Sequence, residues 1–194
     1  MQSMQNIILA AGLGTRSNGE KLFFPWKGKT IIEQVVEQSL QANLDTIVVT
    51  GFQKERVELA LRKLKCDYLH FVFNEHYLEG QFTSTQCGAA HLALSENFYI
   101  TVGDLPLIEA KHYQILAHQL GTYDGVRPRC QGKPGHPVLL TPLIRPFILQ
   151  AEKTQTMKQL LQQFNIKAYA TNDSAYITDI DTAQALEILQ KETT

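Results

Sequence analysis

The residues best suited to chemistry lie in a glycine-rich loop near the N-terminus. An apolar run at residues 6–11 leads directly into Gly12-Leu-Gly14-Thr-Arg16-Ser-Asn-Gly19-Glu-Lys21. Glycines let a backbone turn tightly and bring its N–H groups close to a ligand, and a run of such amides can surround phosphate oxygens. Arg16 and Lys21 add positive charge at the same place, although no turn requires it. The loop is therefore a candidate phosphate cradle.

Two common phosphate motifs are excluded by the spacing within this loop. The dinucleotide fingerprint G-x-G-x-x-G would need a glycine where Ser17 stands, and a P-loop would need a lysine directly after the last glycine, where Glu20 stands. Glycines after a strand also form ordinary turns. The paired cations are what favour the phosphate interpretation over the simple turn.

Carboxylates at two later positions could hold a divalent cation. Asp104 follows an apolar run at residues 98–102, and the stretch Thr178-Asp179-Ile-Asp181-Thr182 would place its two aspartates on one side if it is extended. Mg²⁺ prefers one or two carboxylates, with phosphate oxygens and water completing its octahedron. The alternative is helix capping, by Asp104 or by Asp181 and Thr182.

Two further segments are candidates for contacting substrates. Residues 80–88 carry several hydroxyls, including that of Ser84, at the expected start of a helix, where polar ligands bind but where Ser and Thr also act as caps. Residues 127–137 hold three cations and His136 among two glycines and three prolines. This composition predicts a stiff, exposed loop rather than core. A histidine in such a loop has a structural hydrogen-bonding role as its simplest alternative.

The elements that must position these residues follow from hydrophobic periodicity. Strand-like and helix-like stretches alternate, which favours a largely parallel, three-layer α/β sheet. The loop after residue 11 and Asp104 would then share the carboxyl edge of the sheet, where α/β proteins bind ligands. The predicted strands are 6–11, 46–50, 68–73, 98–102, 137–140 and 166–170. The predicted helices are 30–42, 54–64, 83–94, 109–119, 156–164 and 182–190.

Length, charge and cysteine content narrow the class of protein. A chain of 194 residues without internal repeats or linkers suits one domain spanning residues 1–194. A net charge of −1 argues against a general nucleic-acid or membrane-surface binder. The apolar runs are strand-sized and the first residues lack a signal-peptide pattern, so we expect a cytoplasmic protein. Three cysteines fit no zinc spacing and predict reduced, structural thiols.

The N-terminal loop resembles a known family signature. Leu9-Ala-Ala-Gly-x-Gly-x-Arg16 followed by Lys21 is similar to the loop of the MobA-like NTP transferases, nucleotidyltransferases of the molybdenum cofactor type. The resemblance implies a Rossmann-like nucleotidyltransferase sheet and a loop that wraps a triphosphate. It implies Arg16, Lys21 and Asp104 as catalytic residues, with Mg²⁺ held by Asp104 and Asp181 and with Asp179 in reserve. The implied nucleotide-binding residues are Leu9, Ala10, Ala11, Gly12, Gly14, Arg16, Lys21, Ser84 and Gly103.

The later segments resemble the cytidylyl-transferring branch of that family. The pattern Gly-x-x-Gly-His-Pro-Val around His136 recurs there, and the loop begins Leu-Ala-Ala-Gly rather than the Leu-Ala-Gly-Gly of the guanylyl branch. The branch also carries Gly-Asp-x-Gly-Ala-Arg, where this chain has residues 153–158, so Lys158 retains the arginine's charge without its bidentate geometry. The implied acceptor-binding residues are Gly135, His136, Pro137 and Lys158.

The implied reaction is transfer of CMP from CTP to the phosphate of molybdopterin with release of pyrophosphate. The resemblance also implies delivery to a xanthine-dehydrogenase-type molybdoenzyme as the partner. Two alternatives remain open at this point: a sugar- or alcohol-phosphate nucleotidyltransferase, and a non-catalytic carrier or chaperone of the molybdenum cofactor. Since base selection in such sites uses backbone groups and loop shape, the sequence leaves the nucleobase open.

Overall fold

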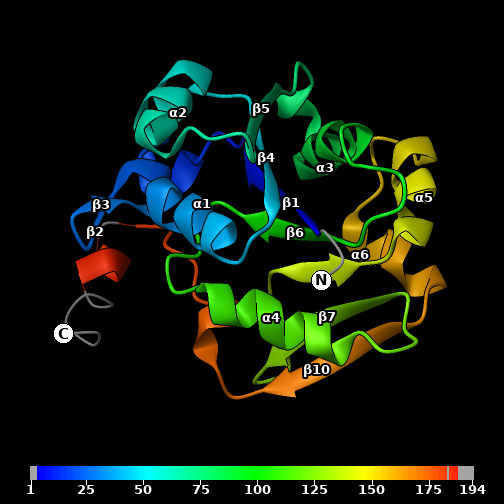
Figure 1. Cartoon of the computed structure of the whole chain (residues 1–194). Helices are drawn as coiled ribbons and strands as arrows, with labels where there is room; N and C mark the ends of the chain where they lie inside the picture. Colours follow the sequence, from blue (N-terminus) through cyan, green and yellow to red (C-terminus); the bar gives the residue numbers. More distant parts are fainter. Residues whose placement is uncertain (1–3, 183, 188–194) are drawn as a thin grey trace.

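A mixed β-sheet forms the centre of the molecule (Figure 1). The computed structural model describes residues 4–182 and 184–187. The strands lie in the order β10-β7-β9-β6-β1-β4-β5, with β8 paired to β7. Four pairs are parallel, namely β6 with β1, β1 with β4, β4 with β5, and β10 with β7. Strand β9 runs antiparallel to both β6 and β7, and so joins the two parallel parts.

The strand bounds show how short the elements of the sheet are. They are β1 Gln5–Ala10, β4 Asp45–Thr50, β5 Leu69–Phe73, β6 Phe98–Val102, β7 Gly125–Cys130, β8 Lys133–Pro134, β9 Val138–Leu140 and β10 Ile166–Thr171. A separate small hairpin consists of β2 Pro25–Trp26 and β3 Lys29–Thr30.

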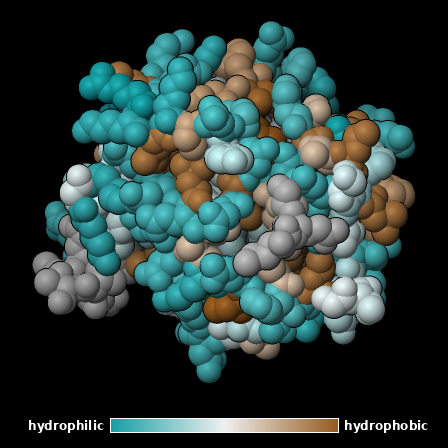
Figure 2. All heavy atoms as spheres, in the orientation of Figure 1, coloured by the Kyte–Doolittle hydropathy of each residue, from teal (hydrophilic) through white to brown (hydrophobic). Residues whose placement is uncertain are grey.

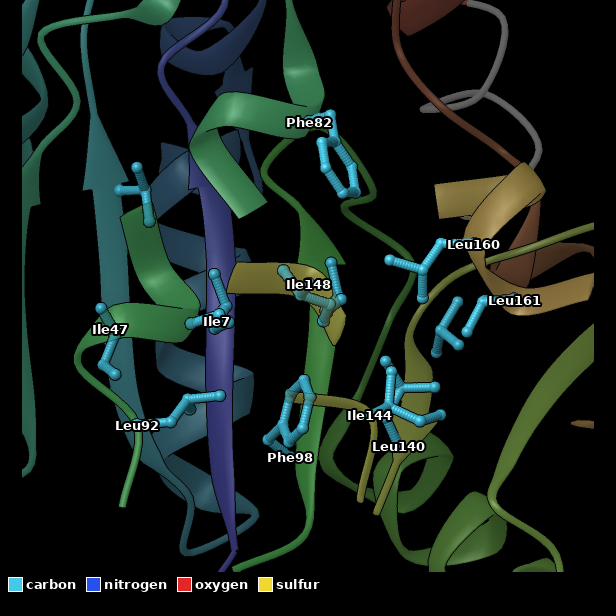
Figure 3. Packing of buried hydrophobic residues seen from close by; sticks show 14 of the residues in the cluster. Ile7, Ile47, Phe82, Leu92, Phe98, Leu140, Ile144, Ile148, Leu160 and Leu161 are labelled. Carbon is cyan, nitrogen blue, oxygen red and sulfur yellow. The ribbon is translucent and has the colours of Figure 1, made fainter. Parts of the chain in front are cut away.

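Helices cover both faces of the sheet, so the fold has three layers. One face carries α1 Ile31–Gln41, α2 Lys54–Leu61 and α4 Ala110–Gln119. The opposite face carries α3 Gln81–Ala90, α5 Arg145–Gln150 and α6 Met157–Leu160. Alternation along β1 separates the two cores, since Ile7 packs with the α3 and α5 side chains and Ile8 packs with those of α1 and α2. Figure 3 shows the first of these cores, with Ile148 between Ile7 and Leu160 in this view.

The first long helix shows how local signals set the elements. Thr30 accepts a hydrogen bond from the Glu33 amide at 3.3 Å, and the Glu33 carboxylate accepts one from the Thr30 amide at 2.7 Å. This capping box starts the helix at Ile31. The inward positions Ile31, Ile32, Val35 and Val36 are all fully buried. Burying each such side chain contributes about 1.5–3 kcal/mol.

The predicted fold class is confirmed as a single α/β domain with a mostly parallel sheet. Each predicted strand is present, with its ends shifted by one residue at most. The predicted helices over 54–64 and 156–164 each end in a 3₁₀ turn, at 62–64 and 161–163. Of the predicted terminal helix, residues 184–187 are helical, while 183 and 188–190 lie outside the described residues.

One prediction about the later loop was wrong. Residues 127–130 form part of strand β7, which pairs with β9, β8 and β10, and Cys130 is completely buried. Side chains on this strand alternate, so Arg127 and Arg129 share one side while Val126 lies in the core on the other. Charged residues and Pro128 concealed the strand. Helix α5 and the β2–β3 hairpin were also not predicted.

The surface of the protein is largely polar. The face drawn in Figure 2 is mostly hydrophilic, with isolated apolar side chains. Within residues 4–182 and 184–187, every helix is too short or too polar to cross a membrane.

Candidate functional site

A cavity of about 690 Å³ lies at the carboxyl edge of β1, β4 and β6. Its size falls within the range typical of small-molecule sites. Twelve residues predicted from the sequence line this first cavity: Leu9, Ala10, Ala11, Gly12, Gly14, Lys21, Ser84, Gly103, Asp104, Gly135, His136 and Asp179. The sequence did not indicate several other lining residues, among them Phe52, Gln53, Tyr77 and Tyr176.

The glycine-rich loop leaves backbone donors available to a ligand. In the described part of the chain, no acceptor is hydrogen-bonded to the N–H groups of Gly12, Leu13 or Gly14. A Cβ added to Gly12 would contact no protein atom within 4 Å, although this residue lines the cavity. Packing therefore does not require a glycine at position 12. The space beside it suits close approach of a polar ligand to the backbone.

Side chains from the start of α2 hold the far end of the loop. The Gln53 amide Nε2 donates to the Gly19 carbonyl at 3.0 Å, and the Gln53 Oε1 accepts from Arg56 at 2.9 Å. Arg56 in turn donates from Nη1 to Glu20 Oε1 at 2.5 Å and from Nη2 to Glu20 Oε2 at 2.6 Å. Gly19 adopts a φ of +81°, and a Cβ there would lie 2.3 Å from Gln53 Nε2. The loop is thus anchored at residues 19–20 and open at 12–14.

Three aspartates meet at the edge of the cavity. Asp104, Asp179 and Asp181 each place a carboxylate oxygen within 4.8 Å of the others. The chain segment that carries the last two is held in place because Ile180 N–H donates to the Asp104 carbonyl at 3.1 Å. Desolvation, together with the neighbouring carboxylates of Asp104 and Asp181, raises the pKa of Asp179. The cluster therefore carries an excess of negative charge.

The capping alternatives do not account for this cluster. Glu109 caps α4, so Asp104 is not the cap of the next helix. Thr182 Oγ1 accepts from the Ala185 amide at 3.1 Å, which leaves the Asp181 carboxylate to the cluster. The Asp104 Oδ1 atom is buried and lacks a hydrogen-bond partner within the described residues. An orphaned buried oxygen among carboxylates fits a hard divalent cation, which binds oxygen ligands.

Two cations predicted from the loop contact this cluster. Lys21 Nζ binds Asp104 Oδ2 and lies 3.5 Å from Asp181 Oδ1, while Arg16 binds Asp181 Oδ2. Desolvation opposes the charged form of Lys21, but the Asp104 and Asp181 carboxylates outweigh it and raise the pKa of Lys21. Lys21 is therefore fully charged at neutral pH. Arg16 is exposed and lies outside the lining of the cavity.

The helix α3 presents Ser84 to the same cavity. Ser84 is buried and accepts a hydrogen bond from Asn74 Nδ2 at 3.0 Å, and Thr83 accepts another at 2.9 Å. Asn74, directly after β5, fixes these hydroxyls, and nothing in the sequence pattern singled it out.

The predicted acceptor residues lie at the other end of the cavity. Gly135 packs so closely on the next segment that a Cβ there would lie 2.4 Å from the Tyr176 carbonyl oxygen. His136 Nδ1 donates to the Ile100 carbonyl at 3.2 Å, so Nε2 can only accept when the ring is neutral. Desolvation, reinforced by the positive charge of Arg127, lowers the pKa of His136. We therefore assign a neutral imidazole at neutral pH.

A second cavity of about 360 Å³ adjoins the first. Both cavities are lined by Leu9, Gly80, Gln81 and His136. Lys158 lines the second cavity and not the first, and Pro137 is buried and lines neither. The predicted site residues thus divide into a group around the loop and the aspartates, and a group around His136.

Comparisons with known proteins find similar sequences and folds over most of the chain. The family model described as the MobA-like NTP transferase domain matches residues 6–169. The chain is 28% identical over 185 residues to the molybdenum cofactor cytidylyltransferase of Escherichia coli K12, covering 94% of this chain and 93% of that protein. It is also 28% identical over 184 residues to a probable molybdenum cofactor guanylyltransferase of Bacillus cytotoxicus, covering 89% and 86%. A Mycobacterium tuberculosis protein solved in complex with manganese has a similar fold, with a TM-score of 0.78, 17% identity and coverage of 98% and 99%.

Proposed function

The chain belongs to the MobA-like NTP transferase family, and from that membership we propose that it transfers CMP from CTP to the phosphate of molybdopterin. One observation supports this most directly. The open amides of the glycine-rich loop, the Lys21 ammonium and the three-aspartate cluster share one edge of the first cavity. Such an edge combines donors for phosphate oxygens with ligands for a divalent cation.

The reaction needs little acid–base help. An oxygen of the acceptor phosphate attacks the α-phosphorus of CTP and forms a new P–O bond. The bond from the α-phosphorus to the bridging oxygen breaks, and pyrophosphate leaves with the electron pair. A phosphate monoester has a second pKa of about 6, so the nucleophile is already ionised near pH 7.

Charge stabilisation is the main task of the protein. In this proposal Lys21, Arg16 and the amides of the loop bind the β- and γ-phosphates and stabilise the charge that accumulates on pyrophosphate. A preorganised donor of this kind contributes about 3 kcal/mol of transition-state stabilisation. Holding both substrates in line contributes a further several kcal/mol.

Asp104 and Asp181 would hold Mg²⁺, with Asp179 in reserve. A bound Mg²⁺ supplies charge neutralisation for the phosphates when two anionic substrates meet. The buried and unpartnered Oδ1 of Asp104 supports this assignment. So does the manganese complex of the structurally similar mycobacterial protein.

The choice of CTP has weaker support than the class of reaction. The Leu-Ala-Ala-Gly loop and the segment around His136 favour cytidylyl transfer, as does the similarity to the Escherichia coli enzyme. Guanylyl transfer is the second candidate, because the Bacillus cytotoxicus relative is equally similar in identity.

Pyrophosphate release tests the proposal. Purified protein is given Mg²⁺ and each of the four NTPs, with and without molybdenum cofactor. We expect release with CTP and cofactor together. Release with GTP and cofactor would establish guanylyl transfer instead, and release only with a sugar 1-phosphate or alcohol phosphate would reassign the acceptor. Folded protein that is silent with every NTP, yet co-purifies with a xanthine-dehydrogenase-type molybdoenzyme, would be a carrier.

A further inference from the structure

The second cavity is placed to hold a molecule that meets the nucleotide. It lies between the start of α3, strand β7 and residues 153–158 before and within α6. His136 and Gln81 line both cavities, so the two cavities meet at these residues. Ligands bound in the two cavities would come close to each other there. Apolar side chains, including Met157 and Leu161, line much of the remainder.

The charges around this cavity do not balance. Its charged lining residues are Glu79, Arg127, Lys153 and Lys158. Glu79 already pairs with Lys153 at 3.1 Å and with His76 at 2.7 Å. Across residues 4–182 and 184–187, Arg127 and Lys158 have no carboxylate partner.

Arg127 is the more unusual of these two cations. Its side chain is half-buried, and its Nε atom is fully buried without a hydrogen-bond acceptor in the described part of the chain. Desolvation, with a smaller effect from the like charge of Arg129, lowers the pKa of Arg127. An arginine remains protonated in proteins, so it cannot relieve this cost by losing its charge. An anion from outside the chain would supply the missing partner.

We propose that the second cavity binds the acceptor through its phosphate monoester group, with Arg127 as the specificity-determining residue that receives the negative charge. The inference rests on the proposed function, since it assigns the second substrate of that reaction to a place. The planar guanidinium matches two phosphate oxygens at once. Lys158 supplies a second, more mobile charge at the exposed rim of the cavity.

The neighbouring Arg129 provides a matched control. It lies two residues along the same strand and is exposed, and it lines neither cavity. Arg127→Met and Arg129→Met therefore remove the same charge from the same side of β7. They differ in whether the lost guanidinium faces the second cavity.

Binding of inorganic phosphate tests the inference without any turnover. The full chain is labelled with ¹⁵N, and the arginine Nε–H signals are followed while phosphate is added, with Arg127→Met used to assign the Arg127 signal. We expect that signal to shift saturably in the wild type and in Arg129→Met. An Arg127 signal that does not respond, while signals of other arginines do, overturns the proposal.

Stability separates ligand binding from a structural role. Because Arg127 has no carboxylate partner among the residues that the structure describes, its replacement by methionine should leave the melting temperature within about 2 °C of the wild type, or raise it. A fall of more than about 5 °C in Arg127→Met, absent from Arg129→Met, would make the residue structural and overturn the proposal.

Where turnover with CTP and molybdenum cofactor is observed, kinetics adds a third readout. Arg127→Met should raise the KM for the cofactor at least about tenfold, with the KM for CTP changed less than twofold, because a charged hydrogen-bond partner is lost from the acceptor alone. An unchanged cofactor KM removes Arg127 from the acceptor site and leaves the proposed function intact. Saturable phosphate binding at Arg127 in a protein that does not use this cofactor supports the inference and rejects only that acceptor.

Discussion

The two cavities differ in how their charges are paired before any ligand arrives. At the first, Lys21 contacts Asp104 and Arg16 contacts Asp181, so both cations of the glycine-rich loop already have a carboxylate, while Lys133 is a further lining cation. In the second, Arg127 has no anionic partner within the described residues. The aspartate end of the first site therefore holds two cation–carboxylate pairs and the further carboxylate of Asp179, whereas the second site keeps an unbalanced positive charge.

This contrast matches what each substrate would bring. A nucleoside triphosphate with its divalent cation carries both signs of charge. Its phosphates would offer Lys21 a new partner, and Asp104 would then be available to hold the cation. An acceptor phosphate brings negative charge alone and needs a cation that is free. This is the pairing pattern that we expect if, as proposed, the first cavity takes the metal-bound nucleotide and the second takes the acceptor.

Asp104→Asn should have the largest effect and would break the first half of this comparison. The substitution keeps the shape but removes the negative charge that a divalent cation requires. We expect kcat to fall on the order of a hundredfold, since a bound metal supplies several kcal/mol of stabilisation. Pyrophosphate release at saturating substrates measures it. Asp45→Asn, which affects another paired carboxylate that lines neither cavity, serves as the control and should be near normal.

Lys21→Ala should have the next largest effect. Its ammonium is the cation that would transfer from Asp104 to the triphosphate, so kcat/KM for the NTP should fall at least about tenfold. Lys29→Ala breaks a similar lysine–carboxylate pair, with Glu37, away from both cavities. Equal activity of the Lys21 and Lys29 variants would contradict the assignment of the first cavity to the triphosphate.

Gln53→Ala should have a smaller effect, confined to the first cavity, because it weakens the anchoring of the glycine-rich loop. The variant removes the 3.0 Å bond to Gly19 and the 2.9 Å bond from Arg56, which anchor the far end of the loop. Loss of about 1 kcal/mol of positioning energy should raise the KM for the NTP about fivefold. The KM for the acceptor should stay unchanged. If both KM values rise together, the loop positions more than the nucleotide.

The sequence was most informative where chemistry and chain order coincide. Loop 9–21 and Asp104 could be placed together because both follow parallel strands, whose carboxyl ends meet at one edge. Asp179 and Asp181 do lie beside Asp104, but their choice as metal ligands came from the family resemblance and stays a prediction. Strands with continuous apolar runs, such as residues 98–102, were predicted with correct bounds.

What the sequence could not reveal depends on partners far along the chain. Strand β7 was not recognised because Pro128 stands among its inward positions and two arginines on its other side. Of these arginines, Arg127 lines the second cavity and Arg129 is exposed. The unpaired state of Arg127 is a property of what surrounds it, and no local pattern encodes it. The roles of Asn74 and Gln53 likewise arise from contacts to α3 and to the loop that only the folded chain shows.

The smallest effect should come from Lys158→Ala. This variant tests whether a lysine that lines the second cavity contributes to acceptor binding only when it has no carboxylate partner. Lys153 and Lys158 both line this cavity and both are exposed, but Lys153 already pairs with Glu79. Exposed charges contribute only about 0.2–1 kcal/mol, so Lys158→Ala should raise the acceptor KM about threefold. Lys153→Ala should change it less than Lys158→Ala does, because its charge is neutralised within the protein. The acceptor KM of both variants is measured in low salt. Equal increases would show that pairing with Glu79 does not distinguish the two lysines. The argument from unpaired charge would then depend on Arg127 alone.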